Sequence, residues 1–350
     1  MGSVADAPNG KRPRISDVAR RAGVSPTTVS HALSGARAVN AETRDRVVRA
    51  AVELGYVPDR LASGLRRQRT SLIGFIGDHV ATTPFAGQMI AGARTAGLDQ
   101  DALMVVAETD GDPSQEHTLI DRLLAQRVDG LLIARMFHQQ ISRPTMPSTV
   151  PIVLVDAAPE AGWHVDAIIP DEAQIAILAC DFLLRAGHRQ IAYAGTSDLS
   201  RAARARLIGV RMALGDAGVH LSPQRIVSVD SDAAGGREAG ARILSRAHPP
   251  TAVICFNDQI AMGVMQAAAR IGLRVPHDLS VIGVDDLRPV ADALDPGLTT
   301  IALPHAAMGR WGMERLLARI NGELDSPPGH LERMPGWLVE RGSVTPPADR

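Results

Sequence analysis

Residues 15–56 read ISDVARRAGVSPTTVSHALSGARAVNAETRDRVVRAAVELGY, and this stretch decides the fold of the N-terminal part of the chain. Ser16 is predicted to cap a short helix with one apolar stripe that includes Val18 and Ala22. Gly23 should end this helix, because glycine adopts the left-handed backbone conformation without steric cost.

A second and a third helix are predicted to follow. Ser25 can cap the second, and Pro26 lies in its first turn, where a missing N–H does no harm. Asn40 can cap the third, which extends to Leu54 and is followed by Gly55. Two short helices joined by a tight turn indicate a helix-turn-helix motif if the free face of the second is polar. That face carries Thr27, Thr28, Ser30 and His31.

Positive charge is concentrated in this end of the chain. Residues 1–70 contain 13 Lys and Arg against 6 Asp and Glu, whereas the remainder contains 24 basic and 32 acidic residues. A three-helix unit that only packs on another domain is the alternative interpretation. The local excess of basic residues favours a surface that binds nucleic-acid phosphates.

Three motifs carry a resemblance to a known family. They are I-S-D-V-A-R-R-A-G-V-S-P-T-T-V-S-H-A-L-S-G, V-N-A-E-T-R-D-R-V and A-V-E-L-G-Y-V-P-D-R-L-A, and together they resemble the headpiece of lactose-repressor-type (LacI-type) transcription regulators. The resemblance implies that the second helix enters the major groove of an operator. The residues it places at the DNA are Ser16, Ser25, Pro26, Thr27, Thr28, Ser30, His31 and Arg37.

Two positions depart from the family pattern. His31 stands where many members have arginine, and Pro26 stands where many have a base-reading side chain. Base recognition is therefore expected to depend more on Thr27 and His31.

The segment 59–70 is basic and connects this headpiece (14–58) to the rest of the chain. It is too short for a stable isolated helix, and Gly64 in its middle adds a penalty of about 1 kcal/mol. The resemblance implies a hinge helix that folds on DNA, with Leu65 wedged into the minor groove. An ordinary arginine-rich linker is the alternative.

Length and composition limit the remaining possibilities. A chain of 350 residues should form two or three units, and no run of about eighteen apolar residues suggests a membrane helix. Residues 1–13 lack the apolar core of a signal peptide and are predicted to be a disordered arm, so a cytoplasmic location is expected. Cys180 and Cys255 lie in apolar surroundings, which is typical of buried small hydrophobes rather than of a disulfide or metal pair.

From residue 71 onward, apolar strands alternate with amphipathic helices. This alternation predicts parallel, doubly wound sheets, and its two successive series predict two lobes with a cleft at the carboxyl ends of the strands. The predicted strands are 72–77, 102–108, 130–134, 151–156, 190–195, 225–230, 251–256 and 280–286; the predicted helices are 84–99, 115–126, 171–186, 201–217, 237–245 and one ending at 271.

Motifs in this region again resemble the LacI-type family, whose core is similar to periplasmic sugar-binding proteins. They include L-I-G-F-I, P-I-V-L-V-D, F-N-D-Q-I-A-M-G and V-P-H-D-L-S-V-I-G-V-D-D. The expected fold is therefore an all-α helix-turn-helix headpiece plus an α/β periplasmic-binding-protein-like core of two doubly wound parallel-sheet lobes. The resemblance implies that 71–345 bind an effector and dimerise, and that the chain crosses between lobes three times. The first lobe would comprise 71–169 and 300–327, including a helix over 303–321, and the second 170–299 and 328–345.

Polar residues at predicted strand ends are the candidate effector ligands. By the resemblance, Arg206, Asn257 and Asp285 hold hydroxyls of a sugar or a polar group of a nucleobase. A bidentate arginine with amide and carboxylate acceptors suits adjacent hydroxyls. Phe85, Asp78, Asp156 and Asp171 are further candidates. The alternative for each Asp or Asn is helix capping, which is the interpretation we favour for Asp258.

No aromatic residue stands near Ser231, where family members that bind flat sugars or purines often have one. Trp163 or Phe137 could stack on a ligand instead, or could pack elsewhere in the protein.

The expected function is a transcriptional repressor, a homodimer or tetramer on a pseudo-palindromic operator, controlled by a small molecule that we expect to be a carbohydrate. A solute-binding protein for uptake would explain the lobes but not the headpiece. A sugar-processing enzyme is the other rival, but the sequence has no G-x-S-x-G, P-loop, H-E-x-x-H or C-x-x-C motif. Its eleven histidines show no metal-ligand spacing, and no cofactor or catalytic residue is predicted.

Overall fold

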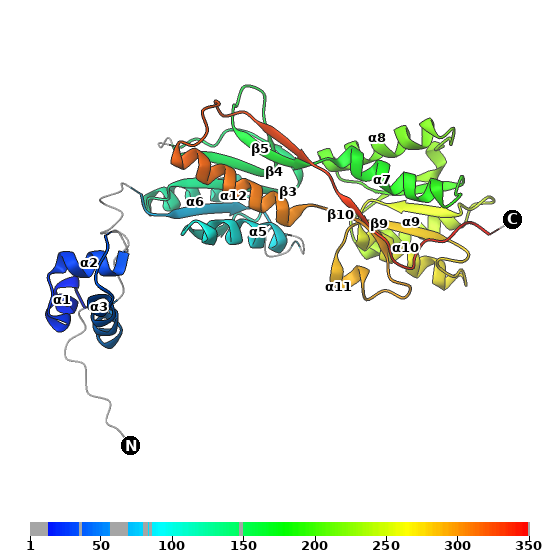
Figure 1. Ribbon diagram of the computed structural model, residues 1–350. Helices are drawn as coiled ribbons and strands as arrows, with labels where there is room; N and C mark the ends of the chain where they lie inside the picture. The colour runs from blue at the N-terminus through cyan, green and yellow to red at the C-terminus, as the bar shows by residue number, and fades with distance from the viewer. Residues whose placement is uncertain are drawn as a thin grey trace, which may run out of the picture. The chain divides into compact units, whose positions relative to one another are not determined.

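The computed structural model describes residues 13–34, 37–56, 69–79, 83, 86–146 and 150–348. The chain divides into two compact units, Met1–Thr70 and Ser71–Arg350. Both are drawn in Figure 1. Leu65 and Phe85 lie outside the described residues.

The first unit is a three-helix domain made of α1 (Ile15–Ala22), α2 (Pro26–Ser34) and α3 (Ala41–Leu54). Its core centres on Val18, Val29 and Val47, one from each helix, all fully buried. The turn between α1 and α2 contains Gly23 at φ 67°, as predicted.

Two of the three predicted helix caps are confirmed and one is wrong. The backbone N–H of Thr28 donates to Ser25 Oγ at 3.1 Å, and that of Glu42 donates to Asn40 Oδ1 at 2.9 Å. Ser16 does not cap α1, because the helix begins one residue earlier, at Ile15. The Asp17 carboxylate instead accepts a hydrogen bond from the Arg14 N–H at 2.9 Å, so the first turn is closed from inside the helix.

The second unit contains two six-stranded sheets, which we call the first and second lobe. The strand orders are β11-β5-β4-β3-β1-β2 and β12-β10-β9-β8-β6-β7, and every neighbouring pair is parallel except β10 and β12. The predicted fold class, a helical headpiece and two doubly wound parallel-sheet lobes, is confirmed.

The elements of the first lobe are β1 (Leu72–Gly77), α5 (Ala86–Asp99), β2 (Leu103–Glu108), α6 (Pro113–Ala125), β3 (Gly130–Ile141), β4 (Ile152–Pro159), β5 (Asp166–Pro170), α12 (His305–Asn321) and β11 (Leu331–Met334). Those of the second lobe are α7 (Glu172–Arg185), β6 (Ile191–Thr196), α8 (Arg201–Asp216), η1 (Pro223–Arg225), β7 (Ile226–Val229), α9 (Ala233–Leu244), β8 (Ala252–Cys255), α10 (Asp258–Arg270), β9 (Ser280–Asp285), α11 (Arg288–Ala291), β10 (Thr299–Ala302) and β12 (Trp337–Val339).

Helix α12 returns to the first lobe, where Figure 1 shows it beside α5. Two glycines allow this close packing. A Cβ atom at Gly92 would collide with the carbonyl oxygen of Ala306, and one at Gly309 would collide with that of Met89. The two helices therefore pack backbone against backbone and cover one face of the first sheet.

We predicted that the chain crosses from the second lobe to the first at residue 300, and this boundary is too early. Strand β10 pairs with β9 in the second sheet, so the crossing falls after Ala302. Thr300 Oγ1 donates to Asp258 Oδ1 at 2.6 Å, which fastens β10 to the start of α10.

The predicted return to the second lobe at 328 is also too early, since β11 pairs with β5 of the first sheet. Asp166 on β5 explains this placement. Its Oδ1 accepts the backbone N–H groups of Gly329 and His330, each at 3.0 Å, and its Oδ2 accepts Nε of Arg319 on α12 at 2.8 Å. The segment before β11 is thereby held on the first lobe.

Cys180 and Cys255 are both free and buried in the second lobe. Burial raises the pKa of Cys180 to about 12. Within the described residues, no helix is long and apolar enough to span a membrane.

Candidate functional site

A small cavity, here called the deep cavity, lies between the two lobes. The first lobe contributes Asp156 from β4 and His305 from α12, and the second contributes Arg206 from α8, the residues that follow β8 and the last residue of β9. The space inside is close to that of one water molecule. Its lining residues are Asp156, Pro170, Glu172, Arg206, Phe256, Asn257, Asp285, Leu303 and His305.

Arg206 is the central residue of the deep cavity. Its side chain is 6% exposed, and its Nε donates to Glu172 Oε2 at 2.6 Å. Nη1 donates to the carbonyl oxygen of Phe256 at 2.6 Å, and the guanidinium carbon lies 4.5 Å from the centre of the Phe256 ring. Burial lowers the pKa of Arg206, but the charges of Glu172 and Asp285 outweigh it and the net effect is a raised pKa. The guanidinium is therefore charged and held in one orientation.

Two carboxyl groups face the same space from opposite lobes. Asp156 is 2% exposed, and its Oδ1 has no hydrogen-bond partner among the described residues. Burial, and then the charge of Glu172, raise the pKa of Asp156 well above its usual range. Burial likewise raises the pKa of Asp285, although Arg206 acts in the opposite direction. Carboxyl groups with raised pKa values can be protonated and then donate as well as accept hydrogen bonds.

Asn257 lines the deep cavity and also caps α10. Its Oδ1 accepts the Ile260 N–H at 2.8 Å, and its Nδ2 donates to the carbonyl of Ser231 at 3.0 Å. The prediction that Asp258 makes this cap is wrong, because Asp258 is the first residue inside the helix. Its fully buried carboxylate accepts from Thr300 Oγ1 at 2.6 Å and from the Leu287 N–H at 2.7 Å, and burial raises its pKa to about 7.

The other predicted effector residues lie outside the deep cavity or outside the described part of the chain. Asp78 accepts the Met136 N–H and the Gln139 side-chain amide, each at 2.8 Å, and so fixes the backbone of β3. Asp171 caps α7 by accepting the Gln174 N–H at 3.1 Å. Phe85 is not among the described residues, so its role stays a prediction.

Of the two aromatic residues that we considered, Trp163 has a described side chain, and it does not line the deep cavity. Trp163 packs against the first-lobe cluster that contains Ile133 and Leu154, and the Phe137 side chain is not described. Phe256 is an aromatic residue that does line the cavity. Sequence reasoning missed Phe256 because it reads as the last apolar residue of a buried strand, and it missed Glu172 because it reads as an ordinary acidic residue in a first helical turn.

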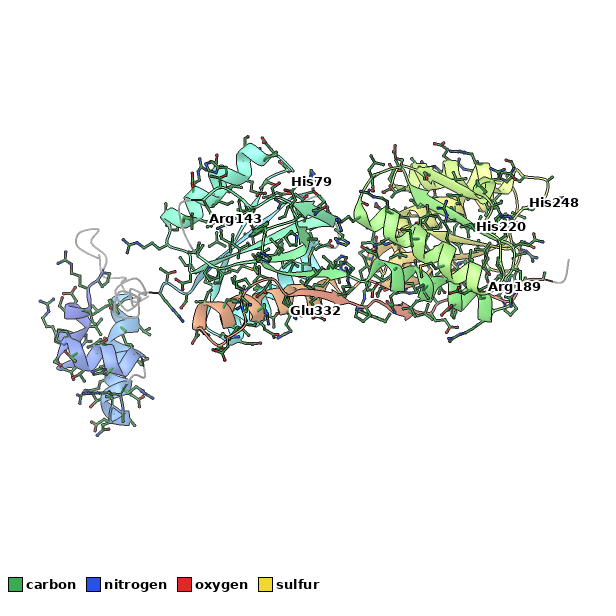
Figure 2. The ribbon with its side chains drawn as sticks, turned by 90° about the horizontal axis from the view of Figure 1, so that it is seen from above. His79, Arg143, Arg189, His220, His248 and Glu332 are labelled. Carbon is green, nitrogen blue, oxygen red and sulfur yellow. The ribbon has the colours of Figure 1, made fainter. Side chains whose placement is uncertain are left out.

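In the headpiece, the predicted DNA-contacting residues lie on or next to α2, except Ser16, which lies in α1, and Arg37, which follows α2 by three residues. Ser16, Ser25, Pro26, Thr27 and Arg37 are exposed, and Thr28, Ser30 and His31 are partly exposed. The opposite face of α2 carries Val29 and Ala32 into the core. Helix α2 therefore presents a continuous polar face, as a recognition helix requires. Figure 2 shows the side chains of this unit and of the two lobes, in which Glu332 marks β11 and Arg189 the second lobe.

These features define a DNA-binding protein with a ligand-binding core. Comparison with known proteins agrees: residues 14–59 match the family model described as bacterial regulatory proteins, lacI family, and residues 180–344 match that of a periplasmic binding protein-like domain.

Individual relatives span nearly the whole chain. The ribose operon repressor of Escherichia coli (strain K12) is 36% identical over 333 residues, which cover 94% of this chain and 99% of that protein. The crystal structure of the lac repressor dimer bound to operator and the anti-inducer ONPF has a TM-score of 0.78 at 30% identity, covering 96% of this chain and 100% of that one. The complex of the transcriptional regulator CelR with cellobiose has a TM-score of 0.67 at 29% identity, covering 95% and 100%.

The chain belongs to the LacI family of bacterial transcription regulators. Its headpiece is the DNA-binding domain of that family, and its two lobes are the periplasmic-binding-protein-like core.

Proposed function

We propose that this protein is a transcriptional repressor whose affinity for operator DNA is controlled by a carbohydrate bound in the deep cavity. It acts by binding rather than by catalysis. Because its partner is bacterial operator DNA, we place it in the cytoplasm. The observation that carries the proposal is the convergence of Arg206, Asn257, Asp156 and Asp285 on one space between the lobes. These groups bring hydrogen-bond donors and acceptors to one space, and a sugar ring presents several hydroxyls that need both.

The named relatives support a carbohydrate over other small molecules. One is a repressor of a ribose operon, and another was solved with cellobiose. In this chain the Arg206 guanidinium covers the ring of Phe256, so that this ring face is not free to stack on a sugar. Hydrogen bonding rather than stacking would therefore dominate recognition.

A homodimer on a pseudo-palindromic operator fits an exposed apolar surface on the first lobe. Strand β2 is the edge of its sheet, and Leu103, Val105 and Val106 on it are 54%, 40% and 42% exposed. Leu98 at the end of α5 is 57% exposed. An uncovered apolar edge strand invites pairing or burial, and a second copy would cover it symmetrically. Two headpieces then read two half-sites.

The size of the deep cavity supports control by ligand. A sugar ring cannot enter a space close to that of one water molecule unless the lobes or their side chains rearrange. A ligand that binds one arrangement better shifts the population toward it, with coupling free energies of typically about 1–3 kcal/mol.

The test is operator binding by fluorescence anisotropy with the full-length protein. A duplex is first selected from a random library, and affinity is then measured with and without pentoses, hexoses and disaccharides. We expect steep salt dependence and a change in affinity of roughly 5- to 150-fold with one sugar. Lack of preference for any duplex would contradict DNA recognition, and indifference to all sugars would contradict the carbohydrate effector.

Matched variants assign the roles. Asp285→Asn should weaken the sugar response, whereas Asp216→Asn, at the exposed end of α8, should not. His31→Arg should change the preferred base at one half-site position, because arginine favours guanine in the major groove. An unchanged selected sequence would show that His31 does not read a base.

A further inference from the structure

A second and larger cavity, here called the outer groove, also lies between the lobes. The first lobe lines it with His138 and Gln140 of β3 and with Arg333 of β11, and the second lobe with Arg201 and Arg204 at the start of α8. Its volume is about 930 Å³, which is sufficient for a small metabolite.

The outer groove is cationic. Arg201, Arg204 and Arg333 line it, against one carboxylate, Asp198, among the described lining residues. The Asp198 oxygens already accept from Thr196 Oγ1 at 3.0 Å and from the Ser200 N–H at 2.8 Å. The N-terminus of the 16-residue helix α8 opens into the same groove and adds partial positive charge.

The arginines retain donors for a ligand. Arg201 donates one bond, from Nη2 to Gln140 Oε1 at 2.8 Å, and Arg204 donates one from Nη2 to the carbonyl of Leu199 at 3.0 Å. Each guanidinium carries five N–H groups in a planar fork that matches phosphate oxygens. Both side chains belong to exposed residues, so they can reorient around a ligand.

His138 provides an independent indication that the groove takes a ligand. It is 5% exposed and lines the groove, and neither of its ring nitrogens has a hydrogen-bond partner among the described residues. Buried polar atoms are normally paired, so unpaired ring nitrogens at a cavity wall require a partner that enters the cavity. Burial, and then the charges of Arg201, Arg333 and Arg206, lower the pKa of His138 to about 4. The ring is therefore neutral and can donate one hydrogen bond to an anion.

The position of His138 is built into the fold. The pairing of β3 with β4 is interrupted between Ala134 and Gln139, and His138 has a φ of 50°. Asp78 holds this irregular segment from both sides through the Met136 N–H and the Gln139 amide. A strained backbone conformation that is fixed by a buried carboxylate is typical of a binding position.

The outer groove and the deep cavity are lined by neighbouring residues. Arg204 and Ala205 line the groove, and the next residue, Arg206, lines the deep cavity. Ser231 of the groove accepts a hydrogen bond from Asn257 of the deep cavity. The two spaces are therefore lined by adjacent positions of α8 and by two residues that are hydrogen-bonded to each other.

We propose that the outer groove is the binding subsite for a phosphate monoester, and that the effector is a phosphorylated carbohydrate whose ring occupies the deep cavity. This inference rests on the proposed function and narrows its ligand class. The phosphate accepts hydrogen bonds from Arg201, Arg333 and His138, and the sugar hydroxyls bind the carboxyl groups beyond. Arginine–phosphate bonds formed by two parallel N–H groups supply the additional affinity.

The test is calorimetric titration of the full-length protein at about pH 7.5, where the phosphate is mostly dianionic. The probes are ribose 5-phosphate, glucose 6-phosphate, the two parent sugars and inorganic phosphate. We expect at least one sugar phosphate to bind about tenfold or more tightly than its parent, and this advantage to fall with added salt. Inorganic phosphate should bind weakly and compete with the ester.

Three variants locate the subsite. Arg201→Gln and Arg333→Gln, both at exposed positions, should each remove most of the advantage of the phosphorylated sugar over its parent, and Arg333→Gln should leave the parent sugar's affinity unchanged. Arg242→Gln is the matched control, because Arg242 is an exposed residue on α9 that pairs with Glu238 outside both cavities. It should retain the advantage. Circular dichroism verifies that all three variants are folded.

Other outcomes overturn the inference. If a parent sugar binds as tightly as its phosphate, the groove is not a phosphate subsite, yet the proposed carbohydrate control stands. If inorganic phosphate binds without competing with the ester, the groove holds a separate anion and the bridging ligand is wrong. If no probe binds and none alters operator affinity, the carbohydrate effector fails as well.

Discussion

The buried ion pair between Arg206 and Glu172 leads to a prediction about the stability of the folded protein. The two side chains are 6% and 3% exposed, and Nε and Oε2 are 2.6 Å apart. Breaking a buried pair by removing one partner costs about 3–5 kcal/mol, because the other charge is left buried without compensation. Removing both charges avoids that penalty.

The magnitudes differ between the two single variants. Arg206→Met leaves Glu172 buried near Asp156 and Asp285, so we expect unfolding to become easier by about 3–5 kcal/mol. Glu172→Gln leaves Arg206 with the Phe256 carbonyl, its ring and Asp285, and we expect a smaller loss of about 1–3 kcal/mol. The double variant should lose less than the sum of the singles by at least about 1 kcal/mol.

The assay is urea unfolding of the four full-length proteins at neutral pH, followed by a double-mutant cycle. The matched control is the exposed pair of Arg242 and Glu238 on α9, whose side chains are 53% and 63% exposed with a separation of 3.4 Å. Arg242→Met and Glu238→Gln should couple by no more than about 0.5 kcal/mol. A coupling energy for Arg206 and Glu172 no larger than this control would refute the reasoning.

Three further predictions concern other parts of the chain. Asp166→Asn should destabilise the first lobe by about 3–5 kcal/mol in thermal unfolding, because the buried Asp166 carboxylate is the shared partner of the partly buried Arg315 and Arg319; a loss below about 1 kcal/mol would contradict this. Because the pKa of His138 in the folded state is lowered to about 4, the unfolded state takes up a proton first, and stability falls as pH drops from about 6.5 to 4. His138→Gln should make this fall smaller, and parallel pH profiles would disprove it. Gly23→Ala should destabilise the headpiece by about 1–2 kcal/mol through its φ of 67°, whereas Gly87→Ala, in open space within α5, should not destabilise the core.

The parts of the fold that could be predicted from sequence are those set by local chemistry. The helices of the headpiece follow from Ser25, Asn40 and Gly23, which act on residues within a few positions. The error at Ser16 has the same origin. Asp17 closes the first turn by a hydrogen bond back to Arg14, and a carboxylate inside a helix is a weaker sequence signal than a serine before it.

Strands β5, β10 and β11 were not predicted, because each is a short segment of four or five residues whose structure depends on a distant partner. The placement of β11 on the first lobe requires Asp166, more than 160 positions away. Short strands without alternation carry no periodicity to detect. Lobe boundaries therefore follow from long-range pairing rather than from composition.

The residues that line the two cavities likewise include some that the sequence could identify and others that it could not. Asn257, Asp156 and Asp285 stand at predicted strand ends, which converge at one edge of a doubly wound sheet, and the family resemblance pointed to Arg206, Asn257 and Asp285. His138 was missed because its exposure to the outer groove results from an irregularity in β3 fixed by Asp78. No local pattern in the sequence marks that irregularity.

The hydrogen bond between Arg201 and Gln140 connects these observations to control of DNA binding. It joins α8 of the second lobe to β3 of the first at 2.8 Å, across the outer groove. Reorientation of the Arg201 guanidinium around a phosphate would break its bond to Gln140, and a sugar ring needs more space than the deep cavity provides. Both parts of the ligand therefore bind only when the two lobes move relative to each other. Part of the binding free energy must then appear as a shift in the equilibrium between arrangements of the lobes. We accordingly expect Gln140→Ala to raise affinity for the effector, and a lower affinity would show that this bond does not oppose binding.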